Sequence, residues 1–482
     1  MPLSHRLGHH LAAASICLFT AACADAPISA PDASLQPRLV GGTSFSSASG
    51  RTAADHVVIQ TRGVESSELV AAVAAAGGQV ERRLPQTNLI VVKGLNAAGI
   101  AALAARGDVA SVTSDVRIRW IPERAAIEKL TLSRPATTVT GPDQSGAFFY
   151  DFYQWNMRQT SANLAWTTTP AGSGATVYVL DTGIDPGHLD LAGLVDESKS
   201  KSFAEFEPDD FLDFNSHGTF VSALIASNGF GMASVAPLAK LVGVKVLDAS
   251  GSGSFVDVIE GIMYAADQGA DVINMSLGAL ADMSFQEDHD LVEHLQAAIT
   301  YARNKGTVIV AAAGNSALNL ATLPSQLMFV PAELAGVISV GATAPVNQEN
   351  FDLRASYSNF GFNGAPRGGG VQVFAPGGDL VAEGDLDFGR DLILSACSQY
   401  VCGDINFYFL GAGTSFASPM VAGEAAVNRS ILGAPSSFRN IACVLQGTDN
   451  IGARGTFGNG RMNVVKSAAC ASSSTVAARV AN

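Results

Sequence analysis

Three polar residues close apolar runs that predict buried strands. Asp181 ends the run "ATVYVLD", Ser276 stands in "DVINMSLG", and Asn315 ends "TVIVAAAGN". The runs are apolar on both faces, which is typical of parallel strands covered by helices on both sides. Ligand sites in such sheets collect just beyond the carboxyl ends of the strands. We therefore expect these three side chains to lie along one edge of a single α/β sheet.

Ser415 is the candidate nucleophile. It lies in "YFLGAGTSFASPMVAGEAAV", where an apolar run and glycines lead into a helical pattern. A helix start offers unpaired N–H groups that suit an oxyanion, although a serine there can also serve only as a helix cap. The same tetrapeptide surrounds Ser44, but there no strand precedes it and no helical pattern follows. The surrounding elements, and not the tetrapeptide, distinguish the two serines.

His217 is the candidate base. It directly precedes a glycine and an apolar helical pattern in "DFNSHGTFVSALIAS", so its ring would stand at a helix entrance. A capping role is the alternative for this residue. Of the other histidines beyond residue 120, His188 lies in a loop. His289 and His294 lie in "QEDHDLVEH", an acidic stretch that predicts a solvent-exposed helix start.

Asp181 also begins an Asp-Thr-Gly triplet, which is the motif of aspartic proteases. That chemistry needs two carboxylates that share a proton. This chain has one such triplet, so a homodimer would have to supply the second. Aspartic proteases are all-β, whereas Asp181 follows a strand of a predicted parallel α/β sheet. We therefore discount this alternative.

Together these motifs resemble those of the subtilase family of serine proteases. "VLDTGID", "HGTFV", "AAAGN" and "GTSFASPMVAG" are similar to its four motifs, and the order Asp, His, Ser is that of subtilisin. The resemblance covers about residues 146–470, including the closing "GNGRMNV". It implies a parallel-sheet α/β domain with helices on both faces that hydrolyses peptide bonds through an acyl-enzyme, with no cofactor for catalysis.

The resemblance also assigns roles to individual residues. Asp181 would orient the histidine, His217 would act as general base and then general acid, and Ser415 would be the nucleophile. Asn315 and the Ser415 backbone N–H would stabilise the oxyanion. The implied substrate-binding residues are Gly251 and Gly253 at the outer rim, Ser276, Leu277 and Gly278 along the substrate backbone, and Ala313 and Gly314 at the opposite pocket wall.

The chain departs from the family pattern at several positions. Phe220 stands where the family often has a second histidine, and Ala223 where it often has glycine; both changes look tolerable. Phe329, before "VPA", falls near the floor of the P1 pocket and would narrow it. The segment "ASNGFGMASVAP" is shorter than the loop that builds a strong calcium site in subtilisin. We assign no metal ligands, and a structural calcium elsewhere stays open.

The segment 54–119 has the pattern strand-helix-strand-strand-helix-strand of a ferredoxin-like unit. Many binding modules share this pattern, but its position before the larger domain suggests a pro-segment. The resemblance implies a zymogen whose pro-domain assists folding, blocks the cleft as an intramolecular inhibitor and is cut away autocatalytically within 120–150. We expect a signal peptide at 1–24, a Ser/Ala/Pro/Gly-rich linker at 25–53, this pro-domain at 54–120, a linker with the processing site at 121–145, the peptidase domain at 146–471 and a tail at 472–482.

The first residues are typical of a secretory signal, with a weakly basic start, a short apolar run and a small-residue exit. Ala22-Cys23-Ala24 matches a cleavage site, whereas "TAAC" resembles a lipoprotein box in which Cys23 would carry the lipid; both exits stay open. No later segment has the ~18 uninterrupted apolar residues that a membrane helix needs. We expect an exported protein, free or anchored to a membrane only through that lipid.

Four cysteines remain beyond the leader region, and they allow three pairings. The short loop favours Cys397–Cys402, which leaves Cys443–Cys470. No histidine stands beside them at metal-ligand spacing, so a zinc site is the weaker interpretation. Both bonds agree with export.

The formal net charge of −14 argues against a nucleic-acid backbone as the main partner. We expect a monomer that acts on protein or peptide substrates. The alternative from another class is an inactive, surface-anchored binding module that kept the fold. The intact Asp181, His217, Ser415 and Asn315 argue against it.

Overall fold

The computed structural model describes residues 52–121, 129–131, 141–205, 207, 210–380, 388–433 and 436–473. All of these belong to one compact unit, Gly41–Asn482. The predicted signal peptide with Cys23, the copy of the tetrapeptide at Ser44, nearly all of the predicted linker 25–53 and most of the predicted tail lie outside the described residues. Much of the predicted linker 121–145 lies outside them too.

The described residues contain a large sheet of ten strands, which confirms the predicted α/β fold class. Its order is β19-β20-β16-β14-β12-β10-β6-β8-β7, and β15 pairs with β14. The pairs from β7 to β20 are parallel, and β15 and β19 are antiparallel additions. The strands are β6 (Thr176–Asp181), β7 (Lys201–Ser202), β8 (Lys240–Lys245), β10 (Val272–Met275), β12 (Val308–Ala312), β14 (Val337–Val346), β15 (Glu349–Arg354), β16 (Val373–Pro376), β19 (Thr448–Asp449) and β20 (Arg461–Met462).

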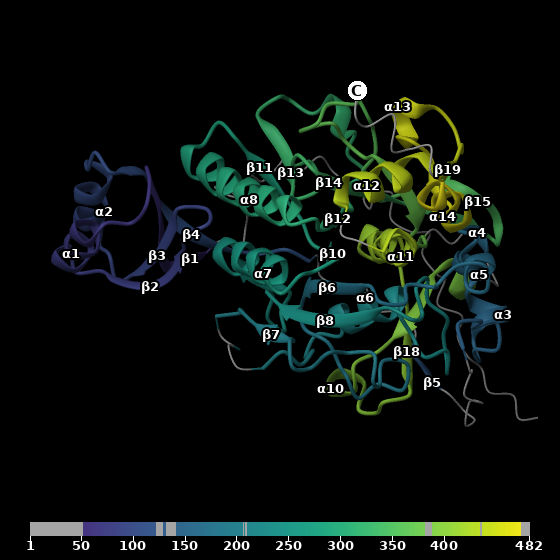
Figure 1. Cartoon of the computed structure of the whole chain (residues 1–482). Coiled ribbons are helices and arrows are strands. Elements are labelled where there is room, and N and C mark those ends of the chain that lie inside the picture. Colours follow the sequence, from purple (N-terminus) through teal and green to yellow (C-terminus); the bar gives the residue numbers. More distant parts are fainter. Residues whose placement is uncertain are drawn as a thin grey trace, which may run out of the picture. The chain divides into compact units, whose positions relative to one another are not determined.

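Alternate residues of the strands face two separate hydrophobic cores. In β6, Val177 and Val179 belong to one core, whereas Tyr178 and Leu180 belong to the other. Figure 1 shows the strands β6, β10 and β12 between α7 and α8 on one side and α11 on the other. Because both faces are covered, the strands are apolar throughout. The main helices are α6 (His217–Ile225), α7 (Phe255–Asp267), α8 (Gln286–Asn304), α11 (Thr414–Leu432), α12 (Ser437–Gln446) and α14 (Val464–Ser472).

Residues 52–121 form a smaller unit, called here the N-terminal unit. Its elements follow the predicted order, and its antiparallel sheet has the order β2-β3-β1-β4 with its own hydrophobic core. The last strand, β4, also pairs with β9, a strand of the larger part of the chain, so the sheet continues across the boundary. The elements are β1 (Thr52–Thr61), α1 (Ser67–Ala75), β2 (Gln79–Leu84), β3 (Leu89–Lys93), α2 (Ala97–Ala104), β4 (Val109–Arg119) and β9 (Ser252–Ser254).

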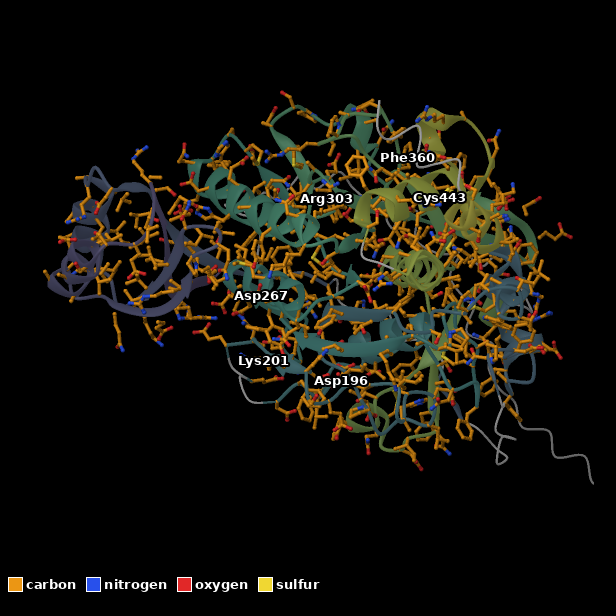
Figure 2. All side chains as sticks on the ribbon, viewed as in Figure 1. Asp196, Lys201, Asp267, Arg303, Phe360 and Cys443 are labelled. Atoms are coloured by element: carbon orange, nitrogen blue, oxygen red, sulfur yellow. A yellow bond between two sulfur atoms is a disulfide. The ribbon has the colours of Figure 1, made fainter. Side chains whose placement is uncertain are left out.

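Both predicted disulfides are present. Cys443–Cys470 joins α12 to α14, and Cys443 is labelled in Figure 2, where side chains fill the space between helices and sheet. Cys397–Cys402 closes a loop that contains the short helix α10. This loop joins β17 to β18, and β18 also pairs with β5. The bounds are β5 (Lys129–Thr131), β17 (Ile393–Ala396), α10 (Gln399–Cys402) and β18 (Phe407–Gly411).

The remaining elements are short and lie outside the large sheet. Beside it, β11 and β13 form an antiparallel pair. The bounds are β11 (Ala279–Asp282), β13 (Leu327–Val330), α3 (Tyr150–Tyr153), α4 (Trp155–Gln159), α5 (Ala162–Ala165), α9 (Phe388–Asp391), α13 (Arg454–Phe457) and a 3₁₀ turn at Leu320–Thr322.

Candidate active site

The carboxyl end of β6 brings Asp181 against His217, the first residue of α6. The Nδ1 atom of His217 lies 2.8 Å from Oδ1 of Asp181, and both side chains are buried. Because a carboxylate can only accept here, the imidazole donates through Nδ1–H. That tautomer leaves a lone pair on Nε2, which is the form of the ring that can accept a proton.

Two glycines allow the strand end and the helix start to approach each other. A Cβ atom on Gly218 would lie 2.0 Å from the carbonyl oxygen of Gly183, and one on Gly183 would lie 2.5 Å from the carbonyl oxygen of Phe211. Gly183 also has a φ of +114°, in the region that favours glycine. These contacts explain why glycine follows His217.

Asp213 organises the start of α6, and the sequence analysis did not single it out. Its carboxylate accepts from the backbone N–H groups of Ser216 at 2.7 Å and Thr219 at 2.8 Å. It also accepts from the hydroxyl of Thr182 at 2.8 Å, and that hydroxyl accepts from the N–H of Gly218 at 3.0 Å. Asp213 therefore caps the helix that begins with His217 and connects it to the residue after Asp181. An aspartate just before a predicted helix start is the signal that could have found it.

Ser415 is the second residue of α11 and is 7 % exposed. Its hydroxyl donates to the carbonyl of Ser276 at 3.2 Å, and the hydroxyl of Ser276 donates back to the carbonyl of Ser415 at 2.8 Å. These two bonds join the end of β10 to the start of α11. Ser415 and Ser276 therefore lie side by side, at the sheet edge where Asp181 also lies.

An aromatic pair lies next to the imidazole. The rings of Phe220 and Phe416 stack with centroids 4.1 Å apart, and the ring of Phe416 lies 5.9 Å from that of His217. Phe220 lies in α6, and its partner Phe416 directly follows Ser415 in α11. The two rings therefore fill the space between α6 and α11 with apolar surface.

Asn315 follows β12 and is fixed by the residue before Ser415. Its Oδ1 atom accepts from the backbone N–H of Thr414 at 2.9 Å and from its hydroxyl at 2.7 Å. With Oδ1 held, the amide nitrogen Nδ2 points away from Thr414. A Cβ atom on Gly413 would lie 3.6 Å from this Nδ2 and 3.7 Å from the N atom of Ser415. Both nitrogen atoms therefore lie beside Gly413, and N–H groups of this kind are the donors that an oxyanion needs.

The two predicted pocket walls enclose an aromatic ring. A Cβ atom on Gly278 would lie 2.5 Å from the ring of Phe329, and one on Gly314 would lie 2.4 Å from the same ring. The ring therefore occupies the space between the walls. Asn359, which the sequence analysis missed, fixes the second wall: its Nδ2 donates to the carbonyl of Ala313 at 2.7 Å, and its N–H donates to the carbonyl of Gly314 at 2.9 Å.

The end of the N-terminal unit runs between the remaining predicted substrate-binding residues. The N–H of Trp120 donates to the carbonyl of Gly251 at 3.0 Å, and its indole N–H donates to the carbonyl of Gly253 at 3.0 Å. The N–H of Gly278 donates to the carbonyl of Trp120 at 3.2 Å. Residues of β4 just before Trp120 pair with β9, and Arg117 forms an ion pair with Asp248. The main chain of 117–121 is thus bonded to β9 and Gly251, and at Trp120 also to Gly278.

A carboxyl cluster lies where β4 meets α7. Oδ1 of Asp115 accepts from the N–H of Val256 at 3.3 Å. Burial, together with the nearby charge of Asp257, raises the pKa of Asp115 to about 7. Burial likewise raises the pKa of Asp257 to about 6. Arg82 of β2 forms an ion pair with Glu260 and lies 3.8 Å from Asp257.

The structure corrects the expectation for one histidine. The stretch at 286–294 was predicted to be a solvent-exposed helix start, but His294 is 4 % exposed within α8. It lies on the same buried face as Leu291 and Ala298, because residues three and four apart share one side of a helix. Burial lowers the pKa of His294 to about 4. His188 is also buried, against Asp190 and Phe407.

The short segment noted in place of a calcium loop supplies donors to a carboxylate. Asp190 accepts from the N–H groups of Phe230 at 2.7 Å and Gly231 at 3.0 Å, and from the hydroxyls of Ser227 at 2.9 Å and Tyr408 at 2.7 Å. The oxygens of Asp190 already accept hydrogen bonds from N–H and O–H donors, whereas calcium binds oxygen atoms. This arrangement therefore does not fit a calcium site. Across the described ranges, no three His, Cys, Asp or Glu side chains are grouped as metal ligands. Nor is any helix in those ranges both long and apolar enough to span a bilayer.

Comparison with known proteins agrees with these observations. The subtilase family matches residues 172–440. A thermophilic serine proteinase of Bacillus sp. (strain AK1) is 36% identical over 322 residues, which are 65% of this chain and 67% of that protein. Thermitase of Thermoactinomyces vulgaris is 33% identical over 66% of this chain and 96% of its own length. The epidermin leader peptide processing serine protease of Staphylococcus aureus is similar in fold, with a TM-score of 0.70, 22% identity and coverage of 86% of this chain and 99% of that chain.

Proposed function

We propose, from the premise that this chain belongs to the subtilase family of serine proteases, that it is an exported endopeptidase with the triad Asp181, His217 and Ser415. The observation that carries the proposal is the 2.8 Å contact between His217 Nδ1 and Asp181 Oδ1, which leaves Nε2 ready to accept a proton. In this proposal His217 takes the hydroxyl proton of Ser415 as the oxygen attacks a peptide carbonyl.

Each later step uses a group already described. The carbonyl oxygen becomes an oxyanion near Gly413, where Nδ2 of Asn315 and the N–H of Ser415 can donate to it. The protonated His217 then gives its proton to the leaving amine, and water hydrolyses the acyl-enzyme with the same base. The Ser415 hydroxyl donates to the carbonyl of Ser276, so it must rotate toward His217 before its oxygen attacks.

We also propose that the N-terminal unit is the inhibitory pro-domain of a zymogen. Supporting this, the strand 117–121 uses the backbone groups of Gly251, Gly253 and Gly278 that the family resemblance assigns to substrate. The chain continues to β5, which pairs with β18, the strand that leads to Ser415. Both ends of 122–128 are therefore anchored near the nucleophile. We place the maturation bond in this segment.

The test is intact mass of the secreted protein, with and without Ser415→Ala, followed by reaction with a fluorophosphonate probe. We expect the wild type to lose the N-terminal unit by a cut within 122–128 and to gain one adduct on the Ser415 peptide. The variant should keep the unit and stay unlabelled. A wild type that matures but takes no label would overturn the triad, and would favour the inactive binding module. The same spectra report the signal cleavage site and any lipid on Cys23.

A further inference from the structure

Lys245, the last residue of β8, connects the segment after Asp181 with the loop before His217. Its side chain is fully buried. The ammonium donates to the carbonyl of Thr182 at 2.9 Å and to the carbonyl of Leu212 at 2.8 Å. Thr182 directly follows Asp181, and Leu212 directly precedes Asp213, which caps the helix of His217. One cation therefore holds the strand end of the acid and the loop of the base together.

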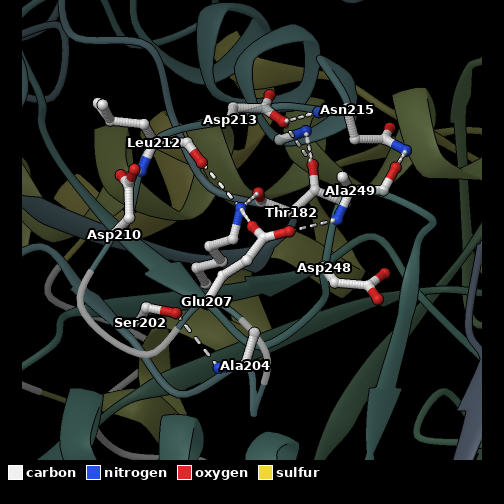
Figure 3. Close-up of polar contacts among 12 residues, drawn as sticks. Thr182, Ser202, Ala204, Glu207, Asp210, Leu212, Asp213, Asn215, Asp248 and Ala249 are labelled. Atoms are coloured by element: carbon white, nitrogen blue, oxygen red, sulfur yellow. Dashed lines mark hydrogen bonds and ion pairs between the residues drawn. The ribbon is translucent and has the colours of Figure 1, made fainter.

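Glu207 supplies the opposite charge. Its Oε2 atom lies 2.5 Å from the ammonium of Lys245, and its Oε1 atom accepts from the N–H of Ala249 at 3.3 Å. The carbonyl of Ala249 accepts from Nδ2 of Asn215 at 2.8 Å. Figure 3 shows Glu207, Thr182 and Leu212 around the same ammonium, with Asn215 and Ala249 nearby. The pair thus reaches the segment that leads into the rim at Gly251.

The loop 212–216 is held from its other side by the disulfide loop. The ammonium of Lys245 lies 5.3 Å from the ring centroid of Phe214, and that ring lies 5.1 Å from the ring of Tyr400 in α10. Ser398 donates through its hydroxyl to the carbonyl of Asp213 at 2.7 Å and through its N–H to the hydroxyl of Ser216 at 2.9 Å. Cation–π contact and hydrogen bonds therefore fix this loop between Lys245 and α10.

The carboxylates around Lys245 and Glu207 have hydrogen-bond partners of their own. Asp181 is bonded to His217, and the carboxylate of Asp213 is taken up by N–H and O–H donors. Asp185 accepts from the N–H of Gln399, a residue of the disulfide loop, at 2.7 Å. Lys245 and Glu207 neutralise each other. Loss of either partner alone would leave one uncompensated charge close to the catalytic pair.

We propose that Lys245 is a positioning residue for the catalytic pair, and that Glu207 balances its charge and ties it to the cleft rim at Ala249. This inference rests on the proposed peptidase function. Lys245 acts through the carbonyls of Thr182 and Leu212, which set how the carboxylate of Asp181 meets the imidazole of His217. It touches neither the substrate nor the reacting atoms.

The experiment compares Lys245→Met, Glu207→Gln and the double variant, which keep side-chain shape while changing charge. Lys240→Met is the matched control, because Lys240 begins the same strand and also donates to a carbonyl, that of Gly193 at 2.7 Å, but is exposed. We expect Lys245→Met to lower kcat by roughly 10- to 100-fold with KM within about 3-fold, since the catalytic groups lose alignment. Lys240→Met should leave both constants unchanged.

The pH profile of kcat/KM separates positioning from mere stability. Lys245→Met leaves a negative charge that favours protonated His217, so the acid limb should move to higher pH. Glu207→Gln leaves a positive charge, so the limb should move to lower pH, and the double variant should return toward the wild type. The direction in which the limb moves in each variant, and not the size of the shift, is the result that tests the proposal.

Active-site titration with the fluorophosphonate probe gives the folded fraction for each variant. Two single variants with the same pH profile as the wild type, or a kcat for Lys245→Met equal to that of Lys240→Met, would overturn the proposal. If Lys245→Met does not fold, Glu207→Gln and the double variant still test the proposal. An acid limb of the kcat/KM profile at the same pH in both variants would contradict the inference. A wild type that neither cleaves peptides nor takes the label would instead refute the proposed function.

Discussion

Replacing Phe329 with alanine should change which residue the enzyme accepts before the scissile bond. The ring of Phe329 occupies the space between Gly278 and Gly314, where a Cβ atom on either glycine would lie within 2.5 Å of it. A substrate side chain that enters between these two walls therefore meets the ring. We expect the wild type to prefer small P1 residues, such as alanine, over phenylalanine.

The size of the effect follows from the buried apolar surface. Full burial of a phenylalanine side chain is worth about 1.5–3 kcal/mol. One factor of ten in rate corresponds to about 1.36 kcal/mol, so Phe329→Ala should raise kcat/KM on a P1-phenylalanine peptide by about 10- to 150-fold. A matched P1-alanine peptide gains no such contact and should change by less than about 3-fold.

The assay uses two peptides that differ only at P1 and are cleaved by the same enzyme preparation. The ratio of their kcat/KM values cancels errors in the active fraction, including any loss of stability caused by the variant. A wild type that cleaves the P1-phenylalanine peptide as well as the P1-alanine peptide would refute the reasoning. An unchanged ratio in Phe329→Ala would do the same.

Three further predictions concern the oxyanion, the pro-domain and the second disulfide. Asn315→Ala should lower kcat by about 10²–10³-fold with little change in KM, because one donor to the oxyanion is lost. Steady-state kinetics test this, and a rise in KM as large as the fall in kcat would contradict it. Burial beside Asp257 raises the pKa of Asp115 to about 7, so docking of a released N-terminal unit would take up a proton. The affinity of this unit should be greatest below about pH 4 and fall as the pH rises to about 7. The measurement is the release rate of the cleaved N-terminal unit as a function of pH. Asp115→Asn should make this rate less dependent on pH, and a variant with the wild-type pH dependence would exclude the Asp115 carboxyl as the cause. Removing the Cys443–Cys470 bond, which spans 27 residues, should lower the free energy of unfolding by about 2–4 kcal/mol, measured by denaturant titration of the Ser415→Ala protein; an unchanged midpoint would contradict it.

The sequence predicted the groups that sit at strand ends and helix starts. Asp181, Ser415 and Asn315 each follow an apolar run or precede a helix, and these local patterns place them at one edge of a parallel sheet. The two disulfides were also predictable, because one short loop left a single remaining pair. Local pattern and spacing were sufficient in these cases.

Other contributors could not be read from the sequence, because their partners are distant along the chain. Lys245 meets the carbonyl of Thr182 across 63 residues, and nothing in "KLVGVKVL" separates a buried lysine at a strand end from an exposed one. Asn359 reaches the carbonyl of Ala313 across 46 residues from a loop. His294 was misjudged because the acidic residues around it obscured the helical period that turns it inward. Tertiary packing decides each of these positions.

The covalent link between the N-terminal unit and the rest of the chain has a consequence for how activity would be switched on. Before a cut in 122–128, the strand 117–121 is tethered beside its own cleft, so its effective concentration there is about millimolar and independent of how much protein is present. After the cut, β5 stays with β18 while the unit can leave, and rebinding then depends on the bulk concentration. Processed enzyme would therefore remain inhibited where its own concentration is high and become active as it is diluted. Dilution into the surroundings, with no further cleavage, would complete the activation.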